Sequence, residues 1–132
     1  MSPKPFSLYN NSSGSTGTIP LSDSAANYSY LEIFLAKIES NGATVSGWWS
    51  VKVPSPDGKI VQVGTQYYPG SSSGVALQLI GKTISISGKS ITPVVISSPN
   101  SEYYINFATG TGAVTALGTQ STIRIMRVDG YK

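Results

Sequence analysis

The spacing of β-branched and aromatic residues is the feature that most constrains this chain. These residues occur in short runs, and clusters of Gly, Pro, Asn and Ser separate one run from the next. No window repeats apolar residues at the 3.6-residue period of a helix. Segment 25–38 is the best helix candidate, but its Tyr, Ile and Phe residues favour a strand. The pattern therefore predicts antiparallel strands joined by turns.

About ten short strands follow from this pattern. They are Phe6–Tyr9, Gly17–Leu21, Tyr28–Ile38, Trp48–Val53, Lys59–Tyr68, Val75–Ile80, Thr83–Ser87, Ser90–Ile96, Ser101–Phe107 and Thr122–Val128. The Pro-Ser-Pro-Asp-Gly turn that ends at Gly58 predicts a hairpin between the fourth and fifth strands. The Gly- and Thr-rich segment 108–121 is expected to be a long exposed loop. Short strands at this spacing predict one domain, residues 1–132, folded as an all-β antiparallel sandwich or barrel that is jelly-roll-like.

The composition argues against most catalytic chemistry. The chain has no His and no Cys, which excludes a His-based triad, a thiolate nucleophile and His or Cys metal ligands. A glycosidase needs two converging carboxyl groups, and the six Asp and Glu residues are expected in solvent at turns and strand edges. We therefore expect no enzyme activity, no cofactor and no metal site.

Charge and hydropathy also exclude two classes of partner. The net charge is +3, but the nine Lys and Arg residues are spread along the chain and form no basic stripe, so we expect no nucleic-acid binding. No stretch approaches the roughly 18 apolar residues of a membrane span, so we expect no membrane insertion.

Three pairs of adjacent aromatic residues, at 48–49, 67–68 and 103–104, carry the functional prediction. Side chains alternate across a strand, so each pair places one ring on each face. Neighbouring residues assign Trp49, Tyr67 and Tyr103 to the core. The other ring of each pair then lies on an exposed polar face. The candidate ligand-binding residues on these faces are Trp48, Lys52, Gln66, Tyr68, Tyr104 and Asn106.

Three interpretations of the exposed aromatic residues remain open. A saccharide has an apolar face for stacking and hydroxyl groups for planar polar side chains. Tyr and Trp also dominate protein interfaces, and exposed rings can simply cover cross-strand neighbours. The segment Tyr28–Ile38 is apolar on both faces, which predicts a central strand or one covered by another subunit. This makes a homo-oligomer an expected partner.

A resemblance to a known protein family spans much of the chain. The similar segments are 8–10, 17–22, 26–34, 50–53, 56–59, 84–88 and 123–132, with motifs such as Leu8-Tyr9-Asn10, Pro56-Asp57-Gly58-Lys59 and Val128-Asp129-Gly130-Tyr131. They resemble the C-terminal tip or head domains of tail fibre, receptor-binding and baseplate proteins of phages and prophages of Gram-positive bacteria. These motifs are strand and turn patterns, and the resemblance assigns no binding residue.

The resemblance implies an antiparallel β tip domain, with a trimer favoured. It implies location in the virion tail, contact with other tail proteins, and action outside the cell at the host surface. Its expected function is recognition of a host cell-wall saccharide, and the alternative is a purely structural tail or baseplate subunit without its own ligand. Segments 37–47 and 109–119 are where specificity is expected to vary.

Overall fold

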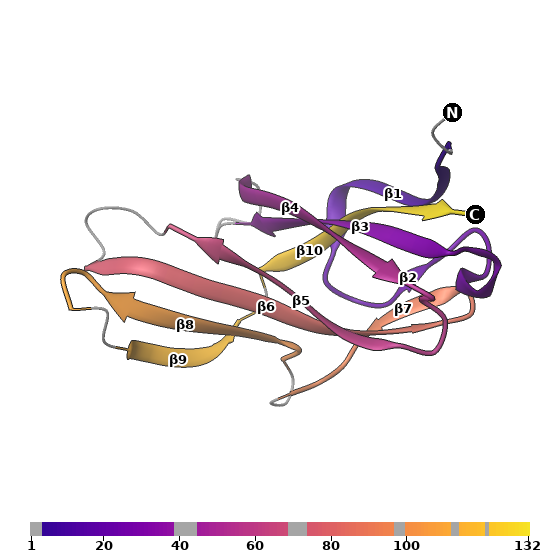
Figure 1. Cartoon of the computed structure of the whole chain (residues 1–132). Helices are drawn as coiled ribbons and strands as arrows, with labels where there is room; N and C mark the ends of the chain where they lie inside the picture. Colours follow the sequence, from indigo (N-terminus) through magenta and orange to yellow (C-terminus); the bar gives the residue numbers. More distant parts are fainter. Residues whose placement is uncertain (1–3, 39–44, 69–73, 97–99, 112–113, 121) are drawn as a thin grey trace.

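The computed structural model describes residues 4–38, 45–68, 74–96, 100–111, 114–120 and 122–132. The strands are β1 (Phe6–Ser15), β2 (Ile19–Pro20), β3 (Tyr30–Ile38), β4 (Val45–Pro54), β5 (Ile60–Tyr67), β6 (Val75–Ser87), β7 (Ser90–Pro93), β8 (Glu102–Ala108), β9 (Val114–Gln120) and β10 (Ile123–Tyr131). A single 3-10 turn, η1 (Ala25–Asn27), is the one helical element of the described residues. The all-β prediction is confirmed. Of the two predicted architectures, the sandwich is the one found (Figure 1).

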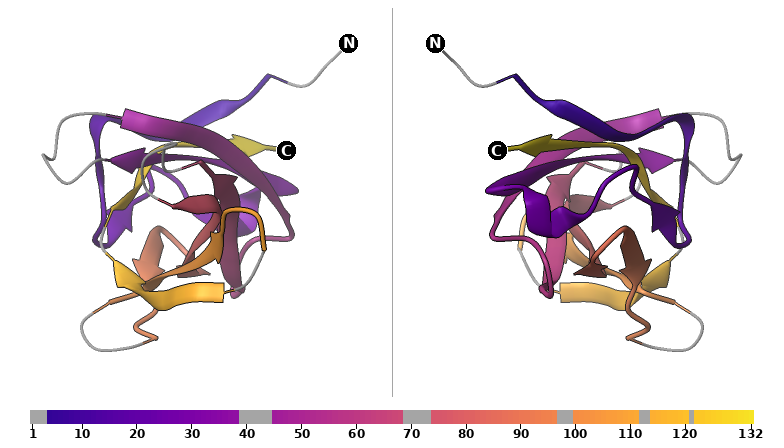
Figure 2. Two further views of the ribbon diagram at one scale, coloured as in Figure 1. Left: turned by 90° about the vertical axis from the view of Figure 1, so that its left-hand side faces the viewer. Right: turned by 90° about the vertical axis from the view of Figure 1, so that its right-hand side faces the viewer.

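Two antiparallel sheets form the layers, as the end-on views of Figure 2 show. Sheet A has the order β1-β10-β3-β4. Sheet B is organised around the long strand β6, which pairs with β5 along one side. Along its other side, β6 pairs with β8 through residues 75–82 and with β7 through residues 84–87. β9 extends the sheet beyond β8, and β2 extends it beyond β7.

The predicted hairpin between Trp48–Val53 and Lys59–Tyr68 is wrong. β4 pairs with β3, β5 pairs with β6, and the turn at residues 55–59 crosses from sheet A to sheet B. Both strands are amphipathic, and the crossing lets their apolar faces point toward each other across the core. Two strands of one sheet would place those faces on the same side. As a result, β4 and β5 are edge strands that border one open side of the sandwich (Figure 1).

Three further segments differ from the sequence-based expectation. β1 runs on through residues 10–15, and β9 lies within the expected long loop. β6 is one strand although a break was predicted at Gly81. Gly81 instead marks a close approach, because it lies beside Gly64 in the sheet and a Cβ atom there would collide with the Tyr103 ring.

The core is built from inward-facing Ile, Leu and Val side chains of both sheets. Leu31, Ile33 and Leu35 of β3 face Ile84 and Ile86 of β6, and all five are fully buried. The predicted central position of this segment is confirmed, because β3 lies between β10 and β4. The structure has no helix, within the described ranges, that is long and apolar enough to cross a membrane.

Candidate functional site

An aromatic cleft opens between the edge strands β4 and β5, at the end of the sandwich where β4 begins and β5 ends. Its volume is about 240 Å³. The residues that line it are Lys37, Ser46, Gly47, Trp48, Trp49, Thr65, Gln66, Tyr67, Tyr68 and Ile80. The turn that crosses between the sheets therefore brings two of the three predicted aromatic pairs to one place.

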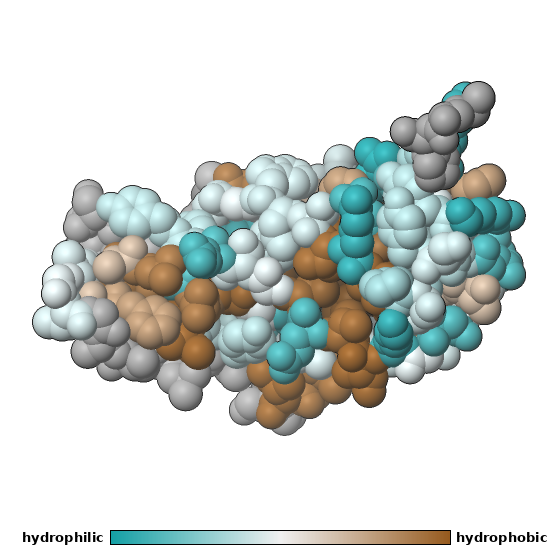
Figure 3. All heavy atoms as spheres, in the orientation of Figure 1, coloured by the Kyte–Doolittle hydropathy of each residue, from teal (hydrophilic) through white to brown (hydrophobic). Residues whose placement is uncertain are grey.

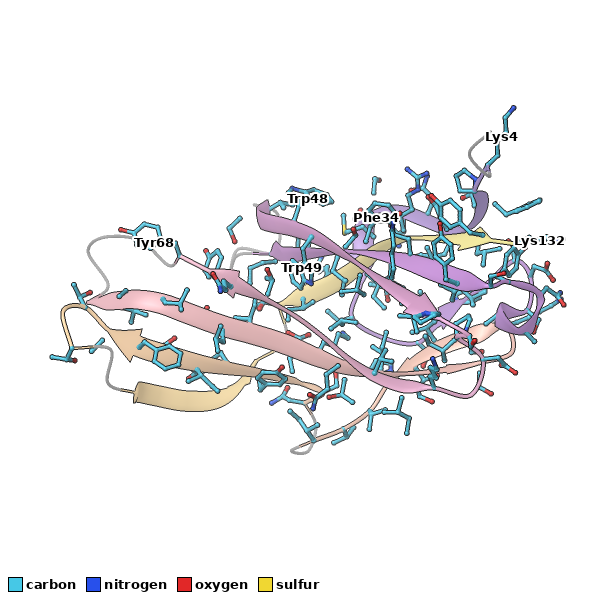
Figure 4. All side chains as sticks on the ribbon, viewed as in Figure 1. Lys4, Phe34, Trp48, Trp49, Tyr68 and Lys132 are labelled. Carbon is cyan, nitrogen blue, oxygen red and sulfur yellow. The ribbon has the colours of Figure 1, made fainter. Side chains whose placement is uncertain are left out.

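Strand alternation sets the direction of each ring in the aromatic cleft. Trp49 and Tyr67 point inward and pack against the core. Trp48 and Tyr68 point outward and are 64% and 61% exposed. Figure 4 shows Trp48 and Trp49 on opposite sides of β4, with Tyr68 at the end of β5. The face assignments predicted for β4 and β5 are thus confirmed, and the aromatic cleft combines half-buried and accessible rings.

Polar groups accompany these rings. The Lys37 ammonium group lies 5.3 Å from the centre of the Tyr67 ring, within range of a cation–π contact. The Trp49 indole Nε1 is buried and has no hydrogen-bond partner among the described residues. A buried donor without a partner is costly, so this N–H group is an unsatisfied polar group beside the cleft.

Three of the six predicted binding residues come together in the aromatic cleft: Trp48, Gln66 and Tyr68. Lys52 lies further along β4, with its ammonium group 5.8 Å from the centre of the Tyr30 ring. Tyr104 and Asn106 lie on β8 and do not line the cleft.

The predicted faces of β8 are reversed. Tyr104 packs against the core, and Tyr103 covers Gly81 and Gly64 on the outer side of sheet B. Asn106 accepts a hydrogen bond from the Gln78 side chain at 2.7 Å across the inner face. Tyr104 and Asn106 are therefore positioned by the core, and neither belongs to the exposed site that the sequence predicted.

Lys37, Trp49 and Tyr67 are among the seven cleft residues that the binding prediction missed. Trp49 and Tyr67 were correctly assigned to the core side of their strands, and the open edge then makes part of that side accessible. Lys37 is the lone cation in the apolar segment 28–38, which was a signal for a special environment. The segment 37–47, expected to vary in specificity, reaches the cleft through Lys37, Ser46 and Gly47, whereas residues 39–44 lie outside the described residues.

A buried ion pair forms the contrasting polar site between the two sheets. Lys82 and Glu102 are 0% and 1% exposed, and Lys82 Nζ lies 3.4 Å from Glu102 Oε2. Lys82 Nζ also donates to the carbonyl oxygens of Thr16, at 2.9 Å, and Ile123, at 3.2 Å. Glu102 Oε1 accepts from the backbone N–H groups of Thr122 and Ile123 at 2.7 and 2.8 Å. The expectation that all carboxylates are solvated is therefore wrong for Glu102, and it is also wrong for Asp129, which is 2% exposed.

Burial has opposite effects on the two members of this pair. Loss of hydration lowers the pKa of the Lys82 amine. It also raises the pKa of the Glu102 carboxyl group, against the smaller opposing effect of its hydrogen bonds and of Lys82. Every contact of the pair is directed at the protein itself, which identifies it as a structural element.

The described residues contain no group of three or more acidic side chains that could hold a metal ion. No family model matches the chain, and no curated protein matches its sequence.

Proposed function

We propose that this domain is a recognition module that binds a saccharide in the aromatic cleft. The observation that carries the proposal is the convergence of four rings, Trp48, Trp49, Tyr67 and Tyr68, with the polar side chains of Lys37 and Gln66. Aromatic rings stack on the apolar face of a sugar, and the amide and ammonium groups match its hydroxyl oxygens. A cleft with apolar walls and a few converging polar groups is the usual form of a small-ligand site.

The proposed biological setting is a phage tail tip that recognises a host cell-wall saccharide, and it rests on the family resemblance. The arrangement of the molecule suits a tip. The start of β1 pairs with the end of β10, so both lie at one end, and the aromatic cleft lies toward the other (Figure 1). A tail protein joined at either terminus would leave the cleft accessible.

We propose binding without turnover. Hydrolysis of a glycosidic bond needs two carboxyl groups on either side of the bond. None of the described residues that line the aromatic cleft is acidic, and Glu102 is fully engaged in the core.

Substitution of the two exposed rings tests the proposal. Trp48→Ala and Tyr68→Ala each remove an accessible stacking surface, so we expect at least a tenfold loss of affinity for wall polysaccharide of the host strain, measured by isothermal titration calorimetry. Phe6→Ala is the matched control, because Phe6 is an aromatic residue that is 48% exposed outside the cleft. Oligomeric state should not change with any of the three substitutions, and melting temperature should not change with Trp48→Ala or Tyr68→Ala. Wild-type affinity in both cleft variants would contradict saccharide binding in the cleft.

The structural alternative is favoured by a different surface. Leu77 and Leu79 of β6 pair with Phe107 and Ile105 of β8 on the outer side of sheet B, and all four are only partly buried. Figure 3 shows hydrophobic side chains gathered over this part of β6 and β8. Exposed apolar patches mark subunit contacts, and we propose that this surface joins copies of the chain, with a trimer favoured.

Sedimentation velocity distinguishes the two roles. Phe107→Ser should dissociate the oligomer and leave saccharide affinity per subunit unchanged, because Phe107 does not line the aromatic cleft. Dissociation by Trp48→Ala or Tyr68→Ala instead, without any saccharide binding by the wild type, would favour the purely structural module. A monomeric wild-type protein at high concentration would contradict self-association.

A further inference from the structure

A second recess lies directly beyond Trp48, on the outer face of sheet A. Its volume is about 330 Å³. The residues that line this outer recess are Asn10, Asn11, Ser12, Phe34, Trp48, Met126 and Arg127. Of the described residues, Trp48 alone lines both the outer recess and the aromatic cleft. Figure 4 shows Phe34 beyond Trp48 along the same side of the sheet.

The outer recess repeats the chemistry of the aromatic cleft. Phe34 supplies an apolar ring, and the Arg127 guanidinium group lies 5.3 Å from the centre of that ring. Arg127 is held in place by Asp129, at 2.8 Å in the ion pair and 2.9 Å in the hydrogen bond from Nε. A planar guanidinium group fixed in this way is a preorganised donor. Asn10 and Asn11 add amide groups at the rim.

The edge position of β4 connects the two recesses. β4 ends sheet A, so the described part of the sheet has no strand beyond it to separate its outer face from the open side of the sandwich. Trp48 lies opposite Ala36 on β3, and Gly47 precedes it. These small neighbours leave the indole ring 64% exposed, so a ligand can contact it from the outer recess and from the aromatic cleft.

We infer that the ligand is a saccharide chain of at least two units that crosses the edge strand at Trp48. One unit occupies the aromatic cleft, and the next lies against Phe34 and Arg127 in the outer recess. This inference rests on the proposed function and deepens it, because a single sugar would fill only one of the two recesses.

A length series of fragments tests the inference. The probes are fragments of one, two and four sugar units from partial hydrolysis of host-wall polysaccharide, and calorimetry gives the dissociation constants. For the wild type we expect affinity to rise at least tenfold between one unit and four. Phe34→Ala should abolish most of that rise and leave the affinity for a single unit unchanged.

Further variants separate a failure of this inference from a failure of the proposed function. Asn10→Ala is the second test of the outer recess, since Asn10 is exposed and its loss should reduce the gain with length without disturbing the core. Tyr68→Ala should lower the affinity for all fragments. Equal gains with length in the wild type, Phe34→Ala and Asn10→Ala would overturn the inference while the proposed function stands. Absence of binding by any fragment or by the polysaccharide would overturn both.

Discussion

The aromatic cleft and the Lys82–Glu102 pair both bring polar groups between the two sheets, but they satisfy those groups differently. Lys82 and Glu102 are fully buried, and protein carbonyl and N–H groups occupy their hydrogen-bonding atoms. In the aromatic cleft, the buried Trp49 indole N–H has no described partner, and the adjoining Trp48 and Tyr68 rings are accessible. The difference separates a site that stabilises the fold from one that can gain a ligand.

Removal of one charge from the buried pair should have the largest effect. Lys82→Met leaves the Glu102 carboxylate buried without its cation, and the carbonyl oxygens of Thr16 and Ile123 lose a donor. Breaking a buried pair in this way costs about 3–5 kcal/mol. Urea denaturation should show that loss in the free energy of unfolding. A loss below about 1 kcal/mol would contradict this expectation, because an exposed surface ion pair contributes no more than that.

Bulk added to the aromatic cleft should affect binding and leave the fold intact. A Cβ atom on Gly47 would make ordinary contacts with Lys37 Cβ, at 3.7 Å, and Tyr67 Cδ2, at 3.8 Å, so the position points into the cleft and accepts a side chain. Gly47→Val should keep the free energy of unfolding within about 1 kcal/mol, because a β-branched residue suits a strand. It should weaken saccharide binding at least tenfold, as measured by calorimetry.

Gly47→Ala is the graded control for this substitution. One methyl group leaves most of the cleft open, so its effect on affinity should be smaller than that of Gly47→Val. Unchanged affinity in both variants, with the fold preserved, would show that the ligand does not enter the cleft.

The indole N–H group of Trp49 can be removed without a change in the shape of the side chain. Replacement of Trp49 by its benzothiophene isostere puts sulfur in the place of the indole N–H group. Stability should stay the same or rise by up to about 1 kcal/mol, because an unpaired buried donor is lost. Saccharide affinity should change little, because the Nε1 atom is shielded from the cleft. A clear loss of stability would instead mean that this N–H group has a protein partner, and the contrast with Lys82 and Glu102 would disappear.

The directions of the cleft side chains could be predicted from the sequence in those strands where alternation and local composition agree. In β4 and β5, one row of side chains is apolar and the other polar, so the faces of Trp48, Trp49, Tyr67 and Tyr68 could be predicted. The same reasoning failed on β8. Its more polar row, with Glu102, Tyr104 and Asn106, faces inward because Lys82 and Gln78, far away in the sequence, supply partners.

The pairing of β4 and β5 was the second feature that could not be predicted from the sequence. The turn at Asp57–Gly58 indicates a reversal of the chain but does not show whether the returning strand joins the same sheet or the opposite one. That choice depends on the core as a whole, since β3 and β6 each provide an apolar partner for one of the two strands. The cleft exists because β4 and β5 stay unpaired with each other, so its location followed from tertiary structure alone.

The smallest expected effect is the pH dependence of stability, which tests the environment of Glu102 in the buried ion pair. Burial raises the pKa of Glu102 above 4.5, its ordinary value. A carboxyl group with a higher pKa in the folded state adds stability that is present below pH 4.5 and is lost as the pH rises through the folded pKa. Glu102→Gln keeps a carbonyl acceptor for Thr122 and Ile123 but does not titrate. Urea titrations from pH 4 to pH 7 should therefore show wild-type stability falling relative to Glu102→Gln. The opposite slope would mean that attraction to Lys82 and the backbone hydrogen bonds outweigh burial, and that Glu102 is held as a stable carboxylate with a lowered pKa.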